Sequence, residues 1–311
     1  MSDKRVILVT GGAGYIGSQL IRDIVLDPRF AGVTVRIYDS LRHKNYSGLM
    51  DLPVEGRYEF IEGDILDRLN LQRAMQDAIA VFHLAAIVTT PLSFDHPEWT
   101  EQINHWGTAA VVDCMLRAGV TRMVYVSSAS VYGPGGPFRE TDLCRPIGPY
   151  ATAKRKGEDE VLQAEERGLE ATIVRLGTTF GNAPAMRFDA SANRFAYLAG
   201  VHRPMVIYGT GGQVRPLIHI RDASNALRLC LADPAFIGET INTASQHPSL
   251  NDIAAVVQRL VPAATTRYTD QDILTEISFD VDASKLMDMG WTPQVSLEAG
   301  LKEVLERWKG F

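Results

Sequence analysis

The stretch Val6-Ile7-Leu8-Val9-Thr10-Gly11-Gly12-Ala13-Gly14-Tyr15-Ile16-Gly17 decides the fold of this chain. An unbroken apolar run of strand length leads into glycines with the spacing Gly-x-x-Gly-x-x-Gly, and the apolar residues that follow have helical spacing. This order predicts a buried parallel strand, a tight turn and the start of a helix.

The glycine turn has the spacing of a dinucleotide site. Gly11 permits the bend, Gly14 lets the main chain approach a pyrophosphate, and Gly17 lets the helix pack closely on the sheet. The free amides at the helix start, which include those of Tyr15 and Ile16, would then bind the phosphates. The alternative is a glycine-rich turn that binds no ligand.

An acidic residue at the end of the second predicted strand supports nucleotide binding. Residues 33–38 lead to Asp39, 22 residues beyond Gly17, about where a carboxylate accepts hydrogen bonds from the adenosine ribose. Arg42 lies in the polar segment that follows and could bind a ribose 2′-phosphate, which would favour NADP. Because Asp39 would repel that phosphate, we expect NAD as the cofactor.

Composition limits the classes of protein. With 311 residues, 46% of them hydrophobic, the chain can form one large α/β domain or a domain with a smaller companion. The net charge of −6, without basic clusters, argues against nucleic acid, and no apolar run is long enough to span a membrane. Because Lys4 and Arg5 lead directly into the first strand, we expect no signal peptide and a cytoplasmic location. The cysteines lack metal-ligand spacing, so no metal site is predicted.

The third and fourth predicted strands end at further candidate residues. Residues 58–61 lead to Asp64-Ile65, where the carboxylate is either an adenine contact or a turn acid. Residues 79–83 lead to Leu84-Ala85-Ala86, small enough for a cofactor that lies across the edge of the sheet. We expect His83 to be a hydrogen-bonded core histidine rather than a catalyst.

The chemistry is clearest after the fifth predicted strand, residues 123–126. This strand leads to Ser127-Ser128-Ala129-Ser130 and a Pro- and Gly-rich loop, and a helix then places Tyr150 and Lys154 one turn apart on the same face. A phenol with a pKa of about 10 is a poor base. A neighbouring ammonium and an oxidised nicotinamide ring would lower this pKa. Ser128 would hold the substrate oxygen whose proton Tyr150 removes.

The sequence beyond these motifs predicts a second, smaller domain. We expect a Rossmann-type doubly wound parallel sheet with a smaller C-terminal α/β lid that binds substrate. The predicted NAD-binding domain is 1–177, with 217–245 returning to it, and the predicted substrate-binding domain is 178–216 with 246–311. Arg187 and Arg215 are either ligands of a substrate diphosphate or solvated surface arginines.

These motifs resemble those of the extended short-chain dehydrogenases/reductases, and most of all the NAD-dependent nucleoside-diphosphate-sugar 4-epimerases of the UDP-glucose/UDP-galactose type. The resemblance covers essentially the whole chain. It is carried by the glycine turn, Asp39, Asp64, residues 83–86, Asn104, residues 127–133, Tyr150 with Lys154, residues 215–219 and residues 282–285.

The resemblance implies roles for individual residues. Ser128, Tyr150 and Lys154 form the catalytic set, and Asn104 helps to organise the cofactor site. The implied substrate-binding residues are Ser128, Ser130, Thr178, Arg187, Asn193, Arg215 and Asp282. The implied reaction removes the sugar O4 proton and the C4 hydride, passes through a 4-keto sugar, and returns both on the opposite face. The family's usual homodimer surface is a helix pair, near 99–118 and 150–167 here. The first of these, predicted over 97–118 from its apolar spacing, could equally be a buried helix of a monomer.

Some positions depart from the family pattern. Related 4,6-dehydratases carry an Asp-Glu pair where this chain has Ala129-Ser130, so we do not expect elimination of water. Thr178 replaces an asparagine, and Val88 stands where galactose epimerases have a lysine, which leaves the sugar and the nucleotide open. The alternatives to an epimerase are an NAD(P)H-dependent reductase or dehydrogenase, and a non-catalytic NAD sensor or scaffold. The complete set of Ser128, Tyr150 and Lys154 argues against the sensor.

Overall fold

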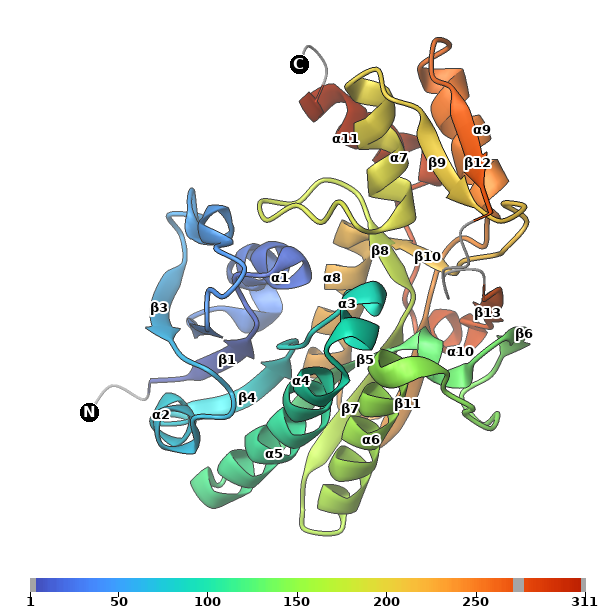
Figure 1. Cartoon of the computed structure of the whole chain (residues 1–311). Coiled ribbons are helices and arrows are strands. Elements are labelled where there is room, and N and C mark those ends of the chain that lie inside the picture. Colours follow the sequence, from blue (N-terminus) through green and yellow to red (C-terminus); the bar gives the residue numbers. More distant parts are fainter. Residues whose placement is uncertain (1–3, 271–276, 309–311) are drawn as a thin grey trace.

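A parallel sheet of seven strands runs through the centre of the molecule (Figure 1). The computed structural model describes residues 4–270 and 277–308. In the order β11-β7-β5-β4-β1-β2-β3, the strands are Glu239–Thr243, Glu170–Leu176, Arg122–Ser128, Ala78–His83, Val6–Thr10, Thr34–Asp39 and Arg57–Glu62. Strand β1 is buried along its whole length, which explains its unbroken apolar sequence. The strand order reverses between β1 and β4, where doubly wound sheets bind ligands beyond the strands' carboxyl ends.

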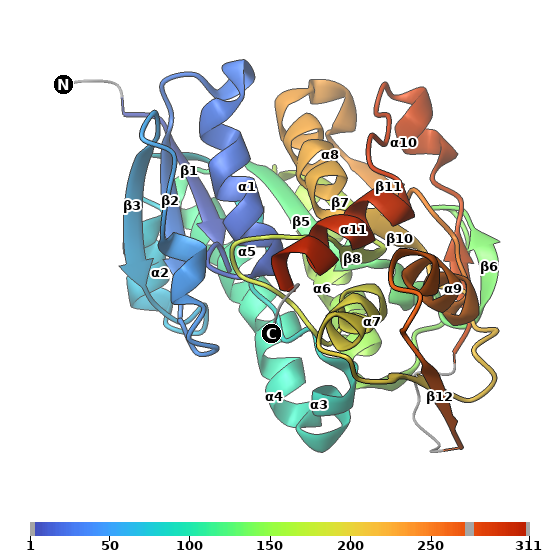
Figure 2. The same ribbon diagram turned by 90° about the horizontal axis from the view of Figure 1, so that it is seen from above.

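Helices cover both faces of this sheet (Figure 2). Helices α1 (Tyr15–Leu26) and α8 (Ile220–Ala232) contribute Ile21 and Leu227 to the apolar core on one face. Helices α2 (Arg68–Ala74), α5 (Gly107–Ala118) and α6 (Gly148–Glu165) cover the other face and contribute Leu71, Met115 and Val161. The predicted Rossmann-type sheet with its flanking helices is therefore confirmed.

The C-terminal segments build a further group of elements with an apolar core of their own. Its strands pair in parallel as β8 (Thr178–Phe180) with β10 (Leu217–His219) and β9 (Met205–Tyr208) with β12 (Thr266–Thr269). Its helices are α7 (Ser191–Gly200), α9 (Leu250–Leu260) and α11 (Leu297–Trp308). At its border, β6 (Gly135–Phe138) pairs with β13 (Phe279–Val281), and α10 (Ser284–Asp288) follows β13. No helix within 4–270 and 277–308 combines the length and the apolar character needed to cross a bilayer.

Three local predictions differ from the structure. The sequence predicts a single helix over 97–118, but a π turn, η3 (Gln102–Trp106), divides it into α4 (Pro97–Glu101) and α5. A short helix that the sequence analysis does not predict, α3 (Thr90–Asp95), precedes α4. The π turn adds a residue at the place where the side chain of Asn104 binds the backbone of Ile87. Strand β6 lies in the predicted Pro- and Gly-rich loop, because its partner β13 is remote in sequence.

The tight approach of helix α1 to the glycine turn generates a prediction. A β-carbon on Gly17 would lie 2.3 Å from the carbonyl oxygen of Gly11. We therefore expect Gly17→Ala to lower the free energy of unfolding by about 1–3 kcal/mol, the usual cost of overpacking, in urea denaturation. Gly212→Ala is the control and should leave stability unchanged, because its β-carbon would meet only the Thr210 hydroxyl at 3.4 Å. Equal stability of both variants would show that the turn can shift at little cost.

Candidate active site

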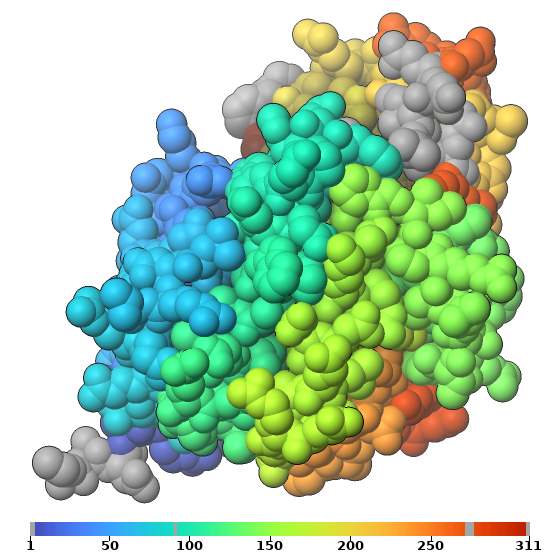
Figure 3. Space-filling model, turned by 60° about the horizontal axis from the view of Figure 1, so that its bottom comes forward, coloured from blue at the N-terminus to red at the C-terminus, as the bar shows by residue number. Residues whose placement is uncertain are grey.

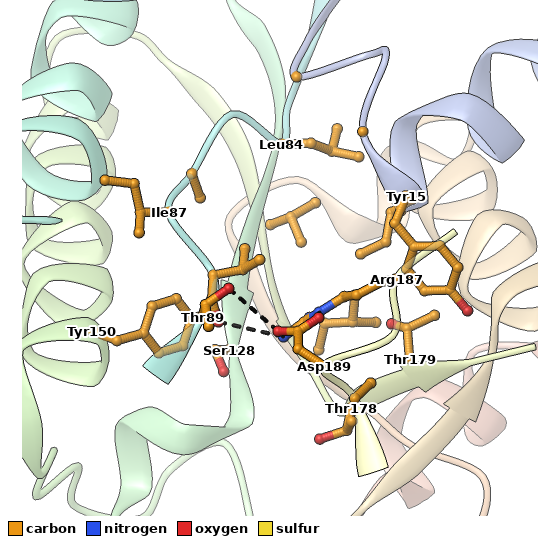
Figure 4. Close-up of a pocket in the computed structure, with 18 of the residues that line it drawn as sticks. Tyr15, Leu84, Ile87, Thr89, Ser128, Tyr150, Thr178, Thr179, Arg187 and Asp189 are labelled. Atoms are coloured by element: carbon orange, nitrogen blue, oxygen red, sulfur yellow. Dashed lines mark hydrogen bonds and ion pairs between the residues drawn. The ribbon is translucent and has the colours of Figure 1, made fainter. Parts of the chain in front are cut away.

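A cavity of about 630 Å³ lies across the carboxyl edge of the sheet. Six consecutive strand ends open into it, because parallel strands all present their carboxyl ends at the same edge. The lining residues at these ends are Gly63 (β3), Asp39 (β2), Gly11 (β1), Leu84 (β4), Ser127 (β5) and Gly177 (β7). Figure 4 shows that residues from the segments after β7, among them Thr178 and Arg187, face Ser128 and Tyr150 across this cavity.

The floor of the cavity at the glycine turn is bare backbone. Gly11 has a φ of +72°, and a β-carbon there would lie 2.7 Å from the backbone nitrogen of Ala85. The amide of Gly14 donates to the carbonyl of Gly11 at 3.1 Å, which closes the turn. Tyr15, Ile16 and Gly17 line the cavity with it. This cradle fits the pyrophosphate of a dinucleotide, because only side-chain-free backbone allows such a close approach.

Asp39 is fixed beside this turn. Its carboxylate accepts the amide of Ala13 at 3.0 Å and the amide of Leu41 at 2.9 Å. Asp64 and Ile65 line the same end of the cavity, and Asp64 also accepts the amide of Leu66 at 3.0 Å, as the turn-acid alternative requires. The carboxylate of Asp39 thus lies where an adenosine ribose would contact it.

Tyr150 and Ser128 meet at the opposite end of the cavity (Figure 4). Ser128 Oγ lies 2.9 Å from Ser130 Oγ and also accepts the Ser130 amide at 3.2 Å. Burial raises the pKa of Tyr150, whereas the hydrogen bond with Ser128 and the positive charge of Arg187 lower it. Ser128 and Tyr150 thus line the same part of the cavity, and their roles stay a prediction.

Lys154 is buried behind this pair. Its ammonium donates to the carbonyl of Val126 at 2.8 Å and lies 5.0 Å from the centre of the Tyr125 ring. Burial lowers the pKa of Lys154 to about 7, against the opposing charge of Glu158. The sequence predicts that Lys154 lowers the pKa of Tyr150. That effect stays a prediction; in this structure the charge of Arg187 lowers the same pKa, against the larger effect of burial.

Arg187 is not a solvated surface arginine. Its Nε and Nη2 atoms donate to the two oxygens of Asp189 at 2.8 and 3.0 Å, and the Thr89 hydroxyl donates to Asp189 at 3.3 Å (Figure 4). Arg215 also lines the cavity, beside the ring of Phe279 at 5.5 Å. Burial lowers the pKa of Arg215 to about 10.

Three predicted residues lie outside the set that lines the cavity. Asn104 binds both the amide and the carbonyl of Ile87, at 2.8 and 2.9 Å, and so orders the loop after β4. Asn193 accepts the amide of Gly181 at 2.8 Å and donates to the hydroxyl of Tyr15 at 3.2 Å. Asp282 accepts the amide of Ser284 at 2.9 Å and Arg139 Nε at 3.2 Å, beside a separate shallow cavity.

The expectation that His83 is a core histidine is confirmed. Its Nδ1 lies 2.7 Å from the hydroxyl of Thr10 and its Nε2 lies 3.1 Å from the hydroxyl of Thr108. Burial, together with the charge of Lys154, lowers the pKa of His83 to about 3. The imidazole is therefore neutral at pH 7, and both of its nitrogens have partners.

A buried ion pair behind the site was not predicted. Glu158, whose side chain is 0% exposed, accepts Arg175 Nη2 at 2.8 Å and Nε at 3.0 Å, and also the hydroxyl of Ser127 at 2.6 Å. Arg175 donates further to the hydroxyl of Tyr132 at 2.8 Å. One feature of the sequence indicates that Glu158 is close to the site: it follows Lys154 by four residues and so lies on the same face of the helix.

This ion pair generates a prediction. Glu158→Gln leaves the buried Arg175 without a counter-charge, so we expect a loss of about 3–5 kcal/mol in the free energy of unfolding at pH 7. The matched control is Glu298→Gln, whose partner Arg259 lies at 3.2 Å and whose side chain is 56% exposed, and it should change stability by less than about 1 kcal/mol. An unchanged urea midpoint for Glu158→Gln would contradict a stabilising role for the pair.

Comparison with known proteins agrees with this geometry. Residues 7–244 match the model of the NAD dependent epimerase/dehydratase family. A putative UDP-glucose 4-epimerase of Methanocaldococcus jannaschii is 26% identical over 98% of both chains. A dTDP-glucose 4,6-dehydratase of Neisseria meningitidis serogroup B is 29% identical over 97% of this chain and 92% of the dehydratase.

A solved structure has a similar fold and a similar level of sequence identity. The UDP-glucuronic acid 4-epimerase from Bacillus cereus, in complex with UDP-glucuronic acid and NAD, superposes with a TM-score of 0.87. It is 26% identical, and the match covers 97% of this chain and 98% of that chain. The cofactor is NAD, and the chain belongs to the NAD-dependent epimerase/dehydratase family.

Proposed function

We propose that the protein epimerises a nucleoside-diphosphate sugar at C4, with UDP-glucose and UDP-galactose as the first substrates to test. The observation that carries this proposal is the segment Ser128-Ala129-Ser130 at the reacting end of the cavity. Elimination of water requires an acid that protonates the leaving hydroxyl. This segment supplies two hydroxyls and a buried methyl group instead.

The acidic residues that line the cavity support the same choice. Among the described residues these are Asp39, Asp64 and Asp189. The first two lie at the adenosine end, remote from Tyr150. The Arg187 guanidinium, which donates two hydrogen bonds to Asp189, holds the pKa of this carboxyl below its usual range against the opposing effect of burial. Asp189 is therefore ionised at neutral pH and is a poor proton donor.

The proposed roles of the reacting groups follow from their positions. When bound, NAD would supply the acceptor for the C4 hydride and the source from which the hydride is restored within the same turnover. Ser128 holds the O4 hydroxyl, and Tyr150 removes and later returns the O4 proton. Arg187 favours the phenolate by its charge. Lys154 fixes helix α6 to the carbonyl of Val126 and adds positive charge behind the phenol.

The remaining predicted roles are part of the proposal. Residues 178–216 and 246–311 would bind the substrate, with Thr178 and Arg215 lining the cavity on that side. Asn193 would act by supporting Tyr15 and the loop that carries Arg187, since its amide binds the hydroxyl of Tyr15 and the carbonyl of Arg187 at 3.2 and 2.9 Å. Asn104 would act through Ile87 in the same indirect way.

An assay without added cofactor tests the reaction. We expect the purified protein to interconvert UDP-glucose and UDP-galactose, as followed by proton NMR, and Tyr150→Phe to reduce kcat by at least about 100-fold while NAD stays bound. Tyr268→Phe is the control, because that ring is 56% exposed and lies outside the residues that line the cavity, and it should keep full activity.

Other outcomes of this assay would replace the proposal. Formation of a 4-keto-6-deoxy sugar would identify a dehydratase, and net consumption of NADPH with a ketone substrate would identify a reductase. Full activity of Tyr150→Phe would remove Tyr150 as the base. Binding of NAD without turnover of any nucleotide sugar would favour a sensor.

We also propose a homodimer through helices α4–α5 and α6. These helices pack against one another, and their teal and yellow-green surfaces lie side by side on one face of the molecule (Figure 3). Trp106, which directly precedes α5, and Leu162 of α6 are 57% and 37% exposed. We expect sedimentation velocity to report a dimer, and Trp106→Glu with Leu162→Glu to give monomers. A wild-type monomer at micromolar concentration would contradict the proposal.

A further inference from the structure

Arg42 and Trp99, which have no part in the proposed reaction, meet across the cavity. The guanidinium carbon of Arg42 lies 4.8 Å from the centre of the Trp99 ring, within the range of a cation–π contact. Arg42 belongs to the loop after β2, whereas Trp99 belongs to α4, and both line the cavity together with Asp39 and Asp64. The contact therefore joins two walls of the cavity at its adenosine end.

The loop that carries Arg42 has an unusual backbone. Leu41 and Lys44 have φ angles of +49° and +54°, which side chains other than glycine rarely adopt. The loop is held at its start, since the amide of Leu41 donates to Asp39 and the amide of Lys44 donates to the carbonyl of Leu41 at 2.7 Å. Backbone strain that persists in this way is often found at ligand clamps.

The loop is also held at its far end. Gly48 packs so closely on Ala13 of the glycine turn that a β-carbon would lie 2.3 Å from the Ala13 carbonyl oxygen. Arg22 of α1 donates to the carbonyl of Gly48 at 2.8 Å. Between these two anchored ends, the side chain of Arg42 is exposed.

The opposite wall is firmly built. Trp99 and Ile103 lie one helical turn apart, and both line the cavity. The π turn that includes Ile103 also includes the buried Asn104, whose amide binds both backbone groups of Ile87. Trp99 thus presents its indole to Arg42 from a helical wall that is attached to the loop after β4.

We propose that Arg42 and Trp99 form a clasp over the adenosine end of the cavity that slows the release of NAD. The cofactor can leave past this end only after Arg42 separates from the indole. This gives Arg42 a role in retaining NAD, in place of the 2′-phosphate contact considered from the sequence. The proposal rests on the position of Asp39 and on the cofactor, and it does not depend on which sugar is converted.

The test follows NAD release without any sugar substrate. Protein loaded with NADH is mixed with excess NAD⁺, and the decay of bound NADH fluorescence gives the dissociation rate. Loss of an exposed cation–π contact corresponds to about a 5-fold change, so Arg42→Gln and Trp99→Leu should each release NADH about 5-fold faster. Because the two residues act through one contact, the double variant should release NADH no faster than the quicker single variant.

Two further variants serve as controls. Arg117→Gln removes an arginine whose side chain is 67% exposed and which does not line the cavity, so it should release NADH at the wild-type rate. Arg42→Lys keeps the cation and should retain part of the effect. Wild-type release from Arg42→Gln would overturn the clasp even if Trp99→Leu were unstable. A double variant whose acceleration is the product of the two single effects would also overturn it, because the residues would then act separately.

Discussion

The attachment of helix α6 to strand β5 is the constraint on which the reacting end of the site depends. Tyr125 donates its hydroxyl to the carbonyl of Lys154 at 3.4 Å, Val126 accepts the ammonium of Lys154, and Ser127 donates to Glu158. These contacts bind consecutive strand residues to successive turns of one helix. The distance between Ser128 on the strand and Tyr150 on the helix is thereby set by hydrogen bonds that solvent does not reach.

Charge in this region is distributed over separate pairs. Glu158 is matched by Arg175 in the interior, and Asp189 is matched by Arg187 in the cavity. Lys154 has no such carboxylate contact among the described residues, and burial brings the pKa of Lys154 to about 7. Arg187 therefore contributes a positive charge to Tyr150 that does not depend on pH near neutrality, whereas the charge of Lys154 does. Paired charges are tolerated in the interior because the attraction within each pair offsets part of the cost of burying both charges.

Much of the nucleotide-binding half could be predicted, because its signals are local. The apolar run of β1, the glycine spacing and Asp39 are close in sequence, and a parallel sheet brings all strand ends to one edge. The same rule places Ser128, at the end of β5, at this edge. The interruption of the helix at Gln102–Trp106 could not be predicted, because it depends on the contact of Asn104 with a loop that lies 17 residues away.

The sequence by itself determined the sheet, the glycine turn and the proposal of Tyr150 as the reacting phenol, since each depends on residue type and short-range spacing. Only the tertiary structure decided which polar side chains are available to a ligand. Asn193 and Asp282 have polar side chains typical of binding residues, but one is occupied by Tyr15, 178 residues away, and the other by Arg139. Arg42 acquires its partner Trp99 in the same way, from an element that only folding brings beside it, whereas the partner of Arg187, Asp189, is local in sequence. A hydrogen-bonding group has a limited number of partners, and the chain's long-range packing determines which of them it meets.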